Sequence, residues 1–166
     1  MVLLRRDLAF LVLAKAVPKS NRRRFQSAAL SHCLVMKSPP GNGATERPLL
    51  SVVDDDEMLR ESLPELLREL GFAARAFSSG QEFLSSDYVD QTKCLILDVA
   101  MPGMSGLDLQ DELKRREQAI PIIFITGQKD EDLRKRAFRQ GAVKFLYKPF
   151  SDSALLDAVN AALSGD

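Results

Sequence analysis

Histidine and cysteine are scarce in this sequence, and their positions exclude several kinds of site. The one histidine among the 166 residues is His32, in the basic N-terminal part of the chain. A histidine-based metal or acid–base site in the remainder is therefore excluded. The two cysteines, Cys33 and Cys94, provide neither a metal-ligand spacing nor a disulfide framework. Cys94 stands in an apolar run, where we expect it to be a small core residue.

Long apolar runs and internal repeats are also missing. No stretch is long enough to cross a membrane as a helix. The apolar run Leu8–Val17 follows Arg5-Arg6 and resembles a short signal sequence or a twin-arginine signal. No clean small-residue cleavage site follows it, so export is the less favoured interpretation.

Charge divides the chain into two parts. Residues 1–48 hold nine Lys or Arg against two acids, a net +7, whereas residues 49–166 hold fourteen against twenty-one, a net −7. We interpret residues 1–47 as a basic, disordered N-terminal extension, or as the product of a start codon assigned too early, with Met36 as the true start. The cluster Arg22-Arg23-Arg24 leaves contact with nucleic acid or anionic lipid as a further alternative.

From residue 49 onward, apolar runs alternate with helical patterns. The apolar runs, bounded by turn formers, predict five strands: Leu49–Val53, Phe72–Phe77, Cys94–Asp98, Pro121–Thr126 and Val143–Tyr147. The segments between them predict five helices that begin near Asp56, Ser79, Ser105, Asp130 and Ser151. Pro64 predicts a local kink on the outer face of the first helix. The alternation predicts a doubly wound α/β fold with a parallel sheet.

Polar side chains stand where four of these strands end. Asp54 and Asp55 follow the first strand, Asp98 ends the third, Thr126 ends the fourth and Lys148 follows the fifth. Ligands bind at the C-terminal strand ends of an open parallel sheet. Three carboxylates there would raise one another's pKa, and Mg²⁺ would relieve their repulsion. The lysine and the threonine hydroxyl suit an incoming phosphoryl group.

Each of these residues also has a simpler interpretation. Asp56, next to the acidic pair, is better explained as a helix N-cap. Thr126 alone would be a strand-end hydroxyl, and Lys148 alone a solvated charge. It is the coincidence on four successive strand ends that favours a functional site.

These motifs resemble the receiver domain of two-component response regulators, of the chemotaxis-regulator type. The resemblance covers essentially all of residues 49–166. The matching segments are Val52–Asp56, Leu97-Asp98 with Met101–Gly106, Ile125–Gly127 and Lys148–Phe150. It implies that residues 48–166 form a flavodoxin-like three-layer sandwich, with a five-stranded parallel sheet in the order 2-1-3-4-5 and five helices.

The resemblance implies a role for each acidic residue. Asp98 would be the phosphoacceptor. Asp55 and Asp98 would bind Mg²⁺ directly, with the backbone carbonyl of Ala100, and Asp54 would act mainly through water. The positions of Ala100 and Gln128 would tune water access to the acyl phosphate.

The remaining site residues also follow from the resemblance. Lys148 would contact the phosphoryl group and precede a cis bond to Pro149, and Thr126 would be the switch hydroxyl. The switch aromatic is Phe145, which lacks a hydroxyl. Tyr147 has one, but its side chain should point to the opposite face from that of Lys148.

The function implied is that of a cytoplasmic phosphorelay receiver. It would catalyse only its own phosphorylation and dephosphorylation, and is in that sense not an enzyme. Its partners would be a sensor histidine kinase and a downstream effector protein, bound at the face formed by the fourth helix, the fifth strand and the fifth helix. Direct nucleic-acid or membrane binding by the receiver is not expected. The length favours a stand-alone receiver, and a fragment of a longer regulator stays open.

Three other functions fit the sequence less well. A metal-dependent phosphatase with an aspartyl nucleophile would commonly carry a second acid two residues later, where this chain has Ala100. An FMN binder would need a hydroxyl- and glycine-rich phosphate loop after the first strand, where Asp54-Asp55-Asp56 would repel phosphate. A phosphorylation-independent interaction module would not need the acidic site.

Overall fold

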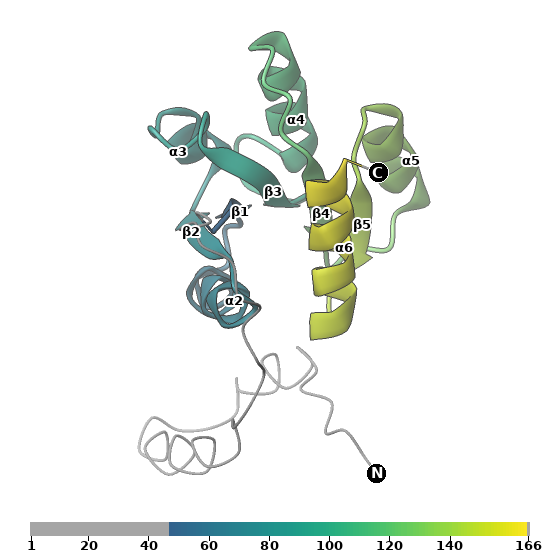
Figure 1. Cartoon of the computed structure of the whole chain (residues 1–166). Coiled ribbons are helices and arrows are strands. Elements are labelled where there is room, and N and C mark those ends of the chain that lie inside the picture. Colours follow the sequence, from purple (N-terminus) through teal and green to yellow (C-terminus); the bar gives the residue numbers. More distant parts are fainter. Residues whose placement is uncertain (1–46, 166) are drawn as a thin grey trace, which may run out of the picture.

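The computed structural model describes residues 47–165, in which a parallel sheet lies between two layers of helices (Figure 1). The strands are β1 (Leu49–Val53), β2 (Ala73–Phe77), β3 (Thr92–Asp98), β4 (Ile122–Thr126) and β5 (Lys144–Tyr147). The helices are α2 (Glu57–Glu69), α3 (Gly80–Leu84), α4 (Gly106–Arg115), α5 (Glu131–Arg139) and α6 (Asp152–Ser164). The sheet order is β2-β1-β3-β4-β5, with every pairing parallel. The predicted fold class and strand order are confirmed.

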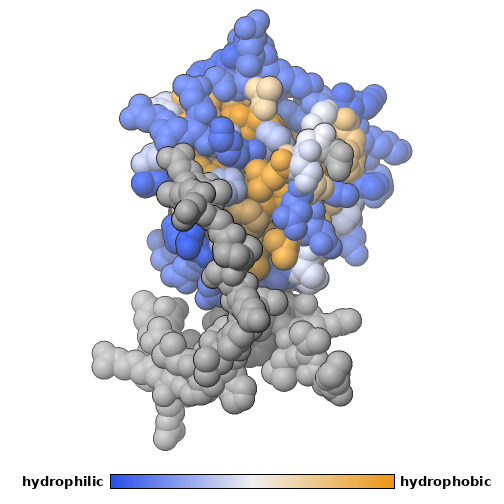
Figure 2. Space-filling model, viewed as in Figure 1, coloured by the Kyte–Doolittle hydropathy of each residue, from blue (hydrophilic) through white to orange (hydrophobic). Residues whose placement is uncertain are grey.

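The predictions that concern His32, Cys33, Met36 and the Arg22–Arg24 cluster lie outside the described residues. Within residues 47–165, no helix is both long and apolar enough to span a bilayer. On the face seen in Figure 2, hydrophilic side chains dominate the periphery and an apolar area lies near the centre.

Side-chain caps fix the start of each helix, as the sequence predicted. The capping residues, each accepting a first-turn N–H, are Asp56, Ser79, Ser105, Asp130 and Ser151. Such a cap replaces one of the backbone partners that a helix end lacks. Glycine then ends α2, because the backbone turns at Gly71 with a φ of 99°.

The placement of Pro64 on the outer face of α2 was wrong. Pro64 is buried, beside Leu63 and close to Leu67, and α2 runs through it from Glu57 to Glu69. The proline ring is apolar, so it contributes to the buried face, whereas its missing N–H removes one helical hydrogen bond wherever it stands.

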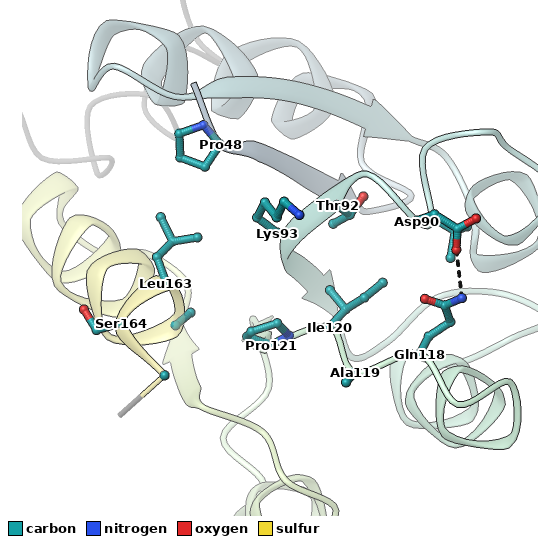
Figure 3. Close-up of a pocket in the computed structure, with 13 residues that line it drawn as sticks. Pro48, Asp90, Thr92, Lys93, Gln118, Ala119, Ile120, Pro121, Leu163 and Ser164 are labelled. Atoms are coloured by element: carbon teal, nitrogen blue, oxygen red, sulfur yellow. Dashed lines mark hydrogen bonds between the residues drawn. The ribbon is translucent and has the colours of Figure 1, made fainter. Parts of the chain in front are cut away.

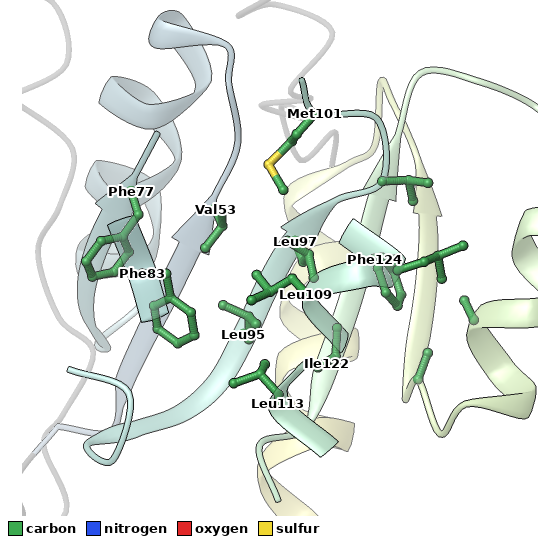
Figure 4. Packing of buried hydrophobic residues seen from close by; sticks show 14 of the residues in the cluster. Val53, Phe77, Phe83, Leu95, Leu97, Met101, Leu109, Leu113, Ile122 and Phe124 are labelled. Carbon is green, nitrogen blue, oxygen red and sulfur yellow. The ribbon is translucent and has the colours of Figure 1, made fainter. Parts of the chain in front are cut away.

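The sheet has a separate hydrophobic cluster on each face. Helices α2 and α6 cover one face and α3, α4 and α5 cover the other (Figure 1). Strand β3 contributes to both clusters, since Cys94 and Ile96 belong to the first and Leu95 and Leu97 to the second. Figure 4 shows Leu95 and Leu97 among the side chains of the second cluster. Burial on both faces, worth about 1.5–3 kcal/mol for each large side chain, fixes the strand that ends in Asp98.

The start of α4 lies against the end of β3. The N–H of Gly106 donates to the carbonyl of Val99 at 3.0 Å. A Cβ at position 106 would overlap the carbonyl oxygen of Asp98 and lie 3.1 Å from the Phe124 ring. Only a glycine allows this approach, which sets the distance between α4 and the candidate site.

We predict that Gly106→Ala lowers the free energy of unfolding by about 1–3 kcal/mol, because the added methyl group forces α4 away from β3. Gly127→Ala is the matched control, since a Cβ there meets nothing within 4 Å. Urea unfolding followed by circular dichroism measures both. Equal stability of the two variants would contradict the packing argument.

Candidate functional site

The C-terminal strand ends bring the predicted site residues to one edge of the sheet. Asp54 directly follows β1, Asp98 and Thr126 are the last residues of β3 and β4, and Lys148 directly follows β5. The register places Asp98 beside Ile125, the neighbour of Thr126. Parallel pairing therefore brings these side chains together from positions far apart in the sequence.

Three carboxylates form the centre of the site. One oxygen from each of Asp54, Asp55 and Asp98 lies within 4.8 Å of the other two. Asp54 and Asp98 are buried, whereas Asp55 is exposed. Negative charges this close repel one another, and a small cation with a preference for oxygen ligands would relieve the repulsion. This all-oxygen donor set fits Mg²⁺ rather than a metal that prefers sulfur or nitrogen.

Lys148 bridges two of the carboxylates. Its Nζ lies 2.7 Å from Asp54 Oδ2 and 3.2 Å from Asp98 Oδ1. Burial disfavours the charged ammonium, but the hydrogen bond and the charge of Asp54, followed by those of Asp98, outweigh it and raise the pKa of Lys148. The ammonium therefore stays charged throughout the neutral range.

Asp98 holds its proton more tightly than an ordinary aspartate. Burial is the largest cause, and the negative charges of Asp54 and Asp55 add to it, while Lys148 acts in the opposite direction. Together they raise the pKa of Asp98 from 3.8 to about 6. In the metal-free protein, ionisation of the Asp98 carboxylate near neutral pH therefore lowers the stability of the fold.

The carboxylate of Asp54 is already occupied by protein groups. Its Oδ1 accepts the N–H of Asp56 at 2.8 Å, and its Oδ2 accepts Lys148 Nζ. Asp56 itself caps α2, with its Oδ1 accepting the N–H of Met58 at 2.9 Å, so the N-cap interpretation of Asp56 is confirmed. Of the acidic pair, only Asp55 is exposed.

Thr126 lies at the site edge, but its hydroxyl is engaged elsewhere. The residue is buried, and its Oγ1 accepts the N–H of Gln128 at 3.1 Å. The backbone N–H of Lys148 donates to the Thr126 carbonyl at 2.7 Å. The structure thus joins Thr126 to Lys148 through the backbone, while the side chain contacts its own loop. Ala100, two residues after Asp98, is exposed.

The aromatic residues of β5 pack edge to face, with an interplanar angle of 65° between Phe145 and Tyr147. Phe145 lies with its ring centroid 6.1 Å from that of Phe124 and 5.5 Å from that of Tyr147. The Tyr147 hydroxyl donates to Glu131 in the first turn of α5 at 3.1 Å. Tyr147 and Lys148 thus have different partners, as alternation along the strand predicts. The expected cis bond between Lys148 and Pro149 is present.

Two residues with a part in the site were missed by the sequence reasoning. Gly106 contacts the Asp98 carbonyl, and its position just inside a helix was a signal, because glycine there is costly unless packing requires it. Arg60 donates from Nη1 to the Asp54 carbonyl at 3.0 Å. No sequence pattern marks a contact between a helix side chain and a strand-end carbonyl.

A separate hollow of about 730 Å³ lies away from the carboxylates. Figure 3 shows Pro48, Pro121 and Leu163 around it, with Asp90 bonded to Gln118 on one side. These residues come from the N-terminal ends of the strands and from the end of α6. None of the predicted site residues lines this hollow. The hollow and the acidic residues therefore lie at opposite ends of the sheet.

The arrangement at the acidic edge would allow a carboxylate to act as a nucleophile. Asp98 offers an oxygen at a strand end, beside a fixed positive charge and two further acids. Such a site suits attack on a phosphorus atom when a cation offsets the negative charges.

Comparisons with known proteins identify the family of the chain. The family of response regulator receiver domains matches residues 50–160. Nodulation protein W of Bradyrhizobium diazoefficiens is 50% identical over 123 residues, which cover 74% of this chain and 54% of that protein. The transcriptional regulatory protein FixJ of Azorhizobium caulinodans is 42% identical over 112 residues, 68% of this chain and 53% of that protein. The chain spans about half the length of these curated relatives.

A solved structure has the same fold. The response regulator receiver protein from Burkholderia phymatum superposes with a TM-score of 0.63 at 40% sequence identity, covering 71% of this chain and 96% of that one.

We predict that Asp98→Asn stabilises the metal-free protein at about pH 8 by about 1–3 kcal/mol. The raised pKa of Asp98 means that folding favours its protonated form. The contribution of this protonation to the free energy of unfolding is complete below pH 3.8 and is lost as the pH rises through about 6. The gain from asparagine should therefore shrink towards about pH 4. Urea unfolding in EDTA at several pH values measures it, and a gain that is independent of pH would contradict the assignment.

Proposed function

The chain belongs to the response regulator receiver family, and we propose that residues 48–166 accept a phosphoryl group on Asp98 from a sensor histidine kinase. One arrangement carries this proposal. Asp98 ends a strand buried on both faces, with Lys148 Nζ 3.2 Å from its Oδ1 and with oxygens of Asp54 and Asp55 within 4.8 Å. The relative FixJ, named as a transcriptional regulatory protein, supports the same class of function.

In the proposed reaction, a carboxylate oxygen of Asp98 attacks the phosphorus of a phosphohistidine. A P–O bond to Asp98 forms as the P–N bond breaks, and the released imidazole takes up a proton from solvent. Hydrolysis of the acyl phosphate later releases inorganic phosphate and restores the carboxylate. The protein thus promotes only its own phosphorylation and dephosphorylation.

The chain's own groups supply position and charge in this reaction. Lys148 balances a negative phosphoryl oxygen next to Asp98. Asp55, Asp98 and the carbonyl of Ala100 would hold Mg²⁺ directly. Asp54 would act mainly through water, because both of its carboxylate oxygens already accept protein hydrogen bonds. Bound Mg²⁺ would supply further positive charge for the transferring group.

The proposed switch begins at Thr126. A phosphoryl group on Asp98 would attract its hydroxyl, which now accepts the N–H of Gln128, and would rearrange the loop that leads to α5. Phe145 would respond only through its packing against Phe124 and Tyr147, since it has no hydroxyl. The face formed by α5, β5 and α6 would then change its affinity for a downstream effector, as a two-state element biased by phosphorylation.

The domain limits belong to the same proposal. The receiver would comprise residues 48–166 and residues 1–47 would form a basic extension. The family match over residues 50–160 and the start of β1 at Leu49 support this division.

We predict a base-labile phosphoryl adduct when the protein is incubated with a small phosphodonor and Mg²⁺, followed by intact-mass spectrometry. Asp98→Asn should abolish the adduct, because its amide cannot act as the nucleophile. Asp87→Asn, which changes an exposed aspartate outside the site, should leave it intact. An adduct that persists in Asp98→Asn would overturn the assignment of the nucleophile. Rapid release of phosphate from many monoesters without an adduct would favour a phosphatase instead.

We predict that Asp55→Asn weakens Mg²⁺ binding roughly tenfold or more, since it removes a negative ligand. Asp56→Asn is the matched control: it removes a charge from the adjacent position, and asparagine caps a helix as well as aspartate does. Calorimetric titration with Mg²⁺ compares the two variants. Equal weakening would mean that general charge, and not ligation by Asp55, governs the affinity.

A further inference from the structure

The backbone and side chain of Asp54 are held at four points. Its N–H donates to the carbonyl of Phe77 at 3.2 Å. Its two carboxylate oxygens accept from Asp56 and from Lys148. Its carbonyl accepts Arg60 Nη1 at 3.0 Å. Of these four contacts, the bond from Arg60 is the one made by a side chain to the backbone at the point where β1 leaves the sheet.

Arg60 reaches from α2 to the end of β1. It is half-buried in the first turns of α2. Its positive charge also reaches Glu82, the pKa of which is lowered first by hydrogen bonds from Ser78 and then, weakly, by Arg60. Glu82 accepts both the N–H and the hydroxyl of Ser78 at 2.6 Å. Ser78 directly follows Phe77, whose carbonyl accepts the N–H of Asp54. The guanidinium therefore links α2 to the ends of β1 and, through charge, to the start of α3.

We propose that Arg60 is a positioning residue for the acidic pair: by holding the Asp54 carbonyl, it fixes the backbone that presents Asp55 to a divalent cation. This inference rests on the proposed function, because it concerns Mg²⁺ bound for phosphoryl transfer. Arg60 itself contacts neither the cation nor the phosphoryl group in this role.

The physical reason lies in where the carbonyl stands. The Asp54 carbonyl belongs to the peptide group that also contains the N–H of Asp55. Asp55 is exposed, so packing does little to fix its orientation. Asp54 is fully buried, and a buried carbonyl left without its partner costs about 1–3 kcal/mol. Without the guanidinium, this peptide group would rotate towards water and take the Asp55 carboxylate with it.

The chain contains a closely matched control in Arg68. It lies on the same helix, and its Nη2 donates to the carbonyl of Ala74 at 2.9 Å. Both arginines thus bond a carbonyl six residues away in sequence. Ala74, however, lies near the start of β2, at the end of the strand remote from the carboxylates. Loss of either bond should affect stability similarly, and only loss of the Arg60 bond should affect the metal site.

The experiment compares Arg60→Met, Arg60→Lys and Arg68→Met in the full chain. Mg²⁺ affinity is measured by calorimetry, and phosphorylation by a small phosphodonor is measured as a function of Mg²⁺ concentration. Arg60→Met should weaken Mg²⁺ binding roughly tenfold, with a phosphorylation rate at saturating Mg²⁺ within about twofold of wild type. Arg68→Met should bind Mg²⁺ like wild type. Arg60→Lys should be intermediate, since lysine keeps the charge and loses the planar fork.

Two results would overturn the positioning role. These are equal Mg²⁺ affinity in Arg60→Met and Arg68→Met, or a lower rate at saturating Mg²⁺ without a change in affinity. Urea unfolding of both methionine variants checks that their stabilities match. Failure of the proposed function itself looks different, because the wild-type protein would then neither bind Mg²⁺ nor form the adduct.

Discussion

The ammonium group of Lys148 lies between two buried carboxylates, and the geometry of the whole edge depends on it. Burying Asp54 and Asp98 next to each other would be costly without a counter-charge. The lysine offsets that cost at 2.7 Å and 3.2 Å, and so ties the end of β5 to the ends of β1 and β3. The same charge that keeps the sheet edge together is the one available to a phosphoryl group. The two carboxylates and the proposed phosphoryl group would therefore compete for the Lys148 ammonium. This competition is a natural origin for a conformational change on phosphorylation.

Much of the fold and of the candidate site could be predicted from the sequence, because both follow local rules. Four apolar residues before Asp98 predicted a strand, and its side chains divide between the two hydrophobic clusters. Asp56 was correctly predicted as a cap. The proximity of Asp54, Asp98 and Lys148 could be predicted because parallel strands all end at one edge of the sheet.

The sequence could not predict contacts between side chains and distant backbone. Arg60 donates to the backbone carbonyl of Asp54, and every residue has such a carbonyl, so the sequence does not mark this partner. A kink at Pro64 was expected on the outer face of α2 because the proline interrupts the helix interior, but its apolar ring is buried. The direction of the Thr126 hydroxyl, towards Gln128, depends on the loop conformation. The roles of Arg60 and Thr126 in phosphoryl transfer stay predictions.

The contact of Gly106 with the Asp98 carbonyl has a mechanical consequence. With no side chain between them, the end of β3 and the first turn of α4 are in close contact, so neither can shift towards the other. We expect a displacement that begins at Asp98 to pass instead to the neighbouring strand β4, where Asp98 pairs with Ile125.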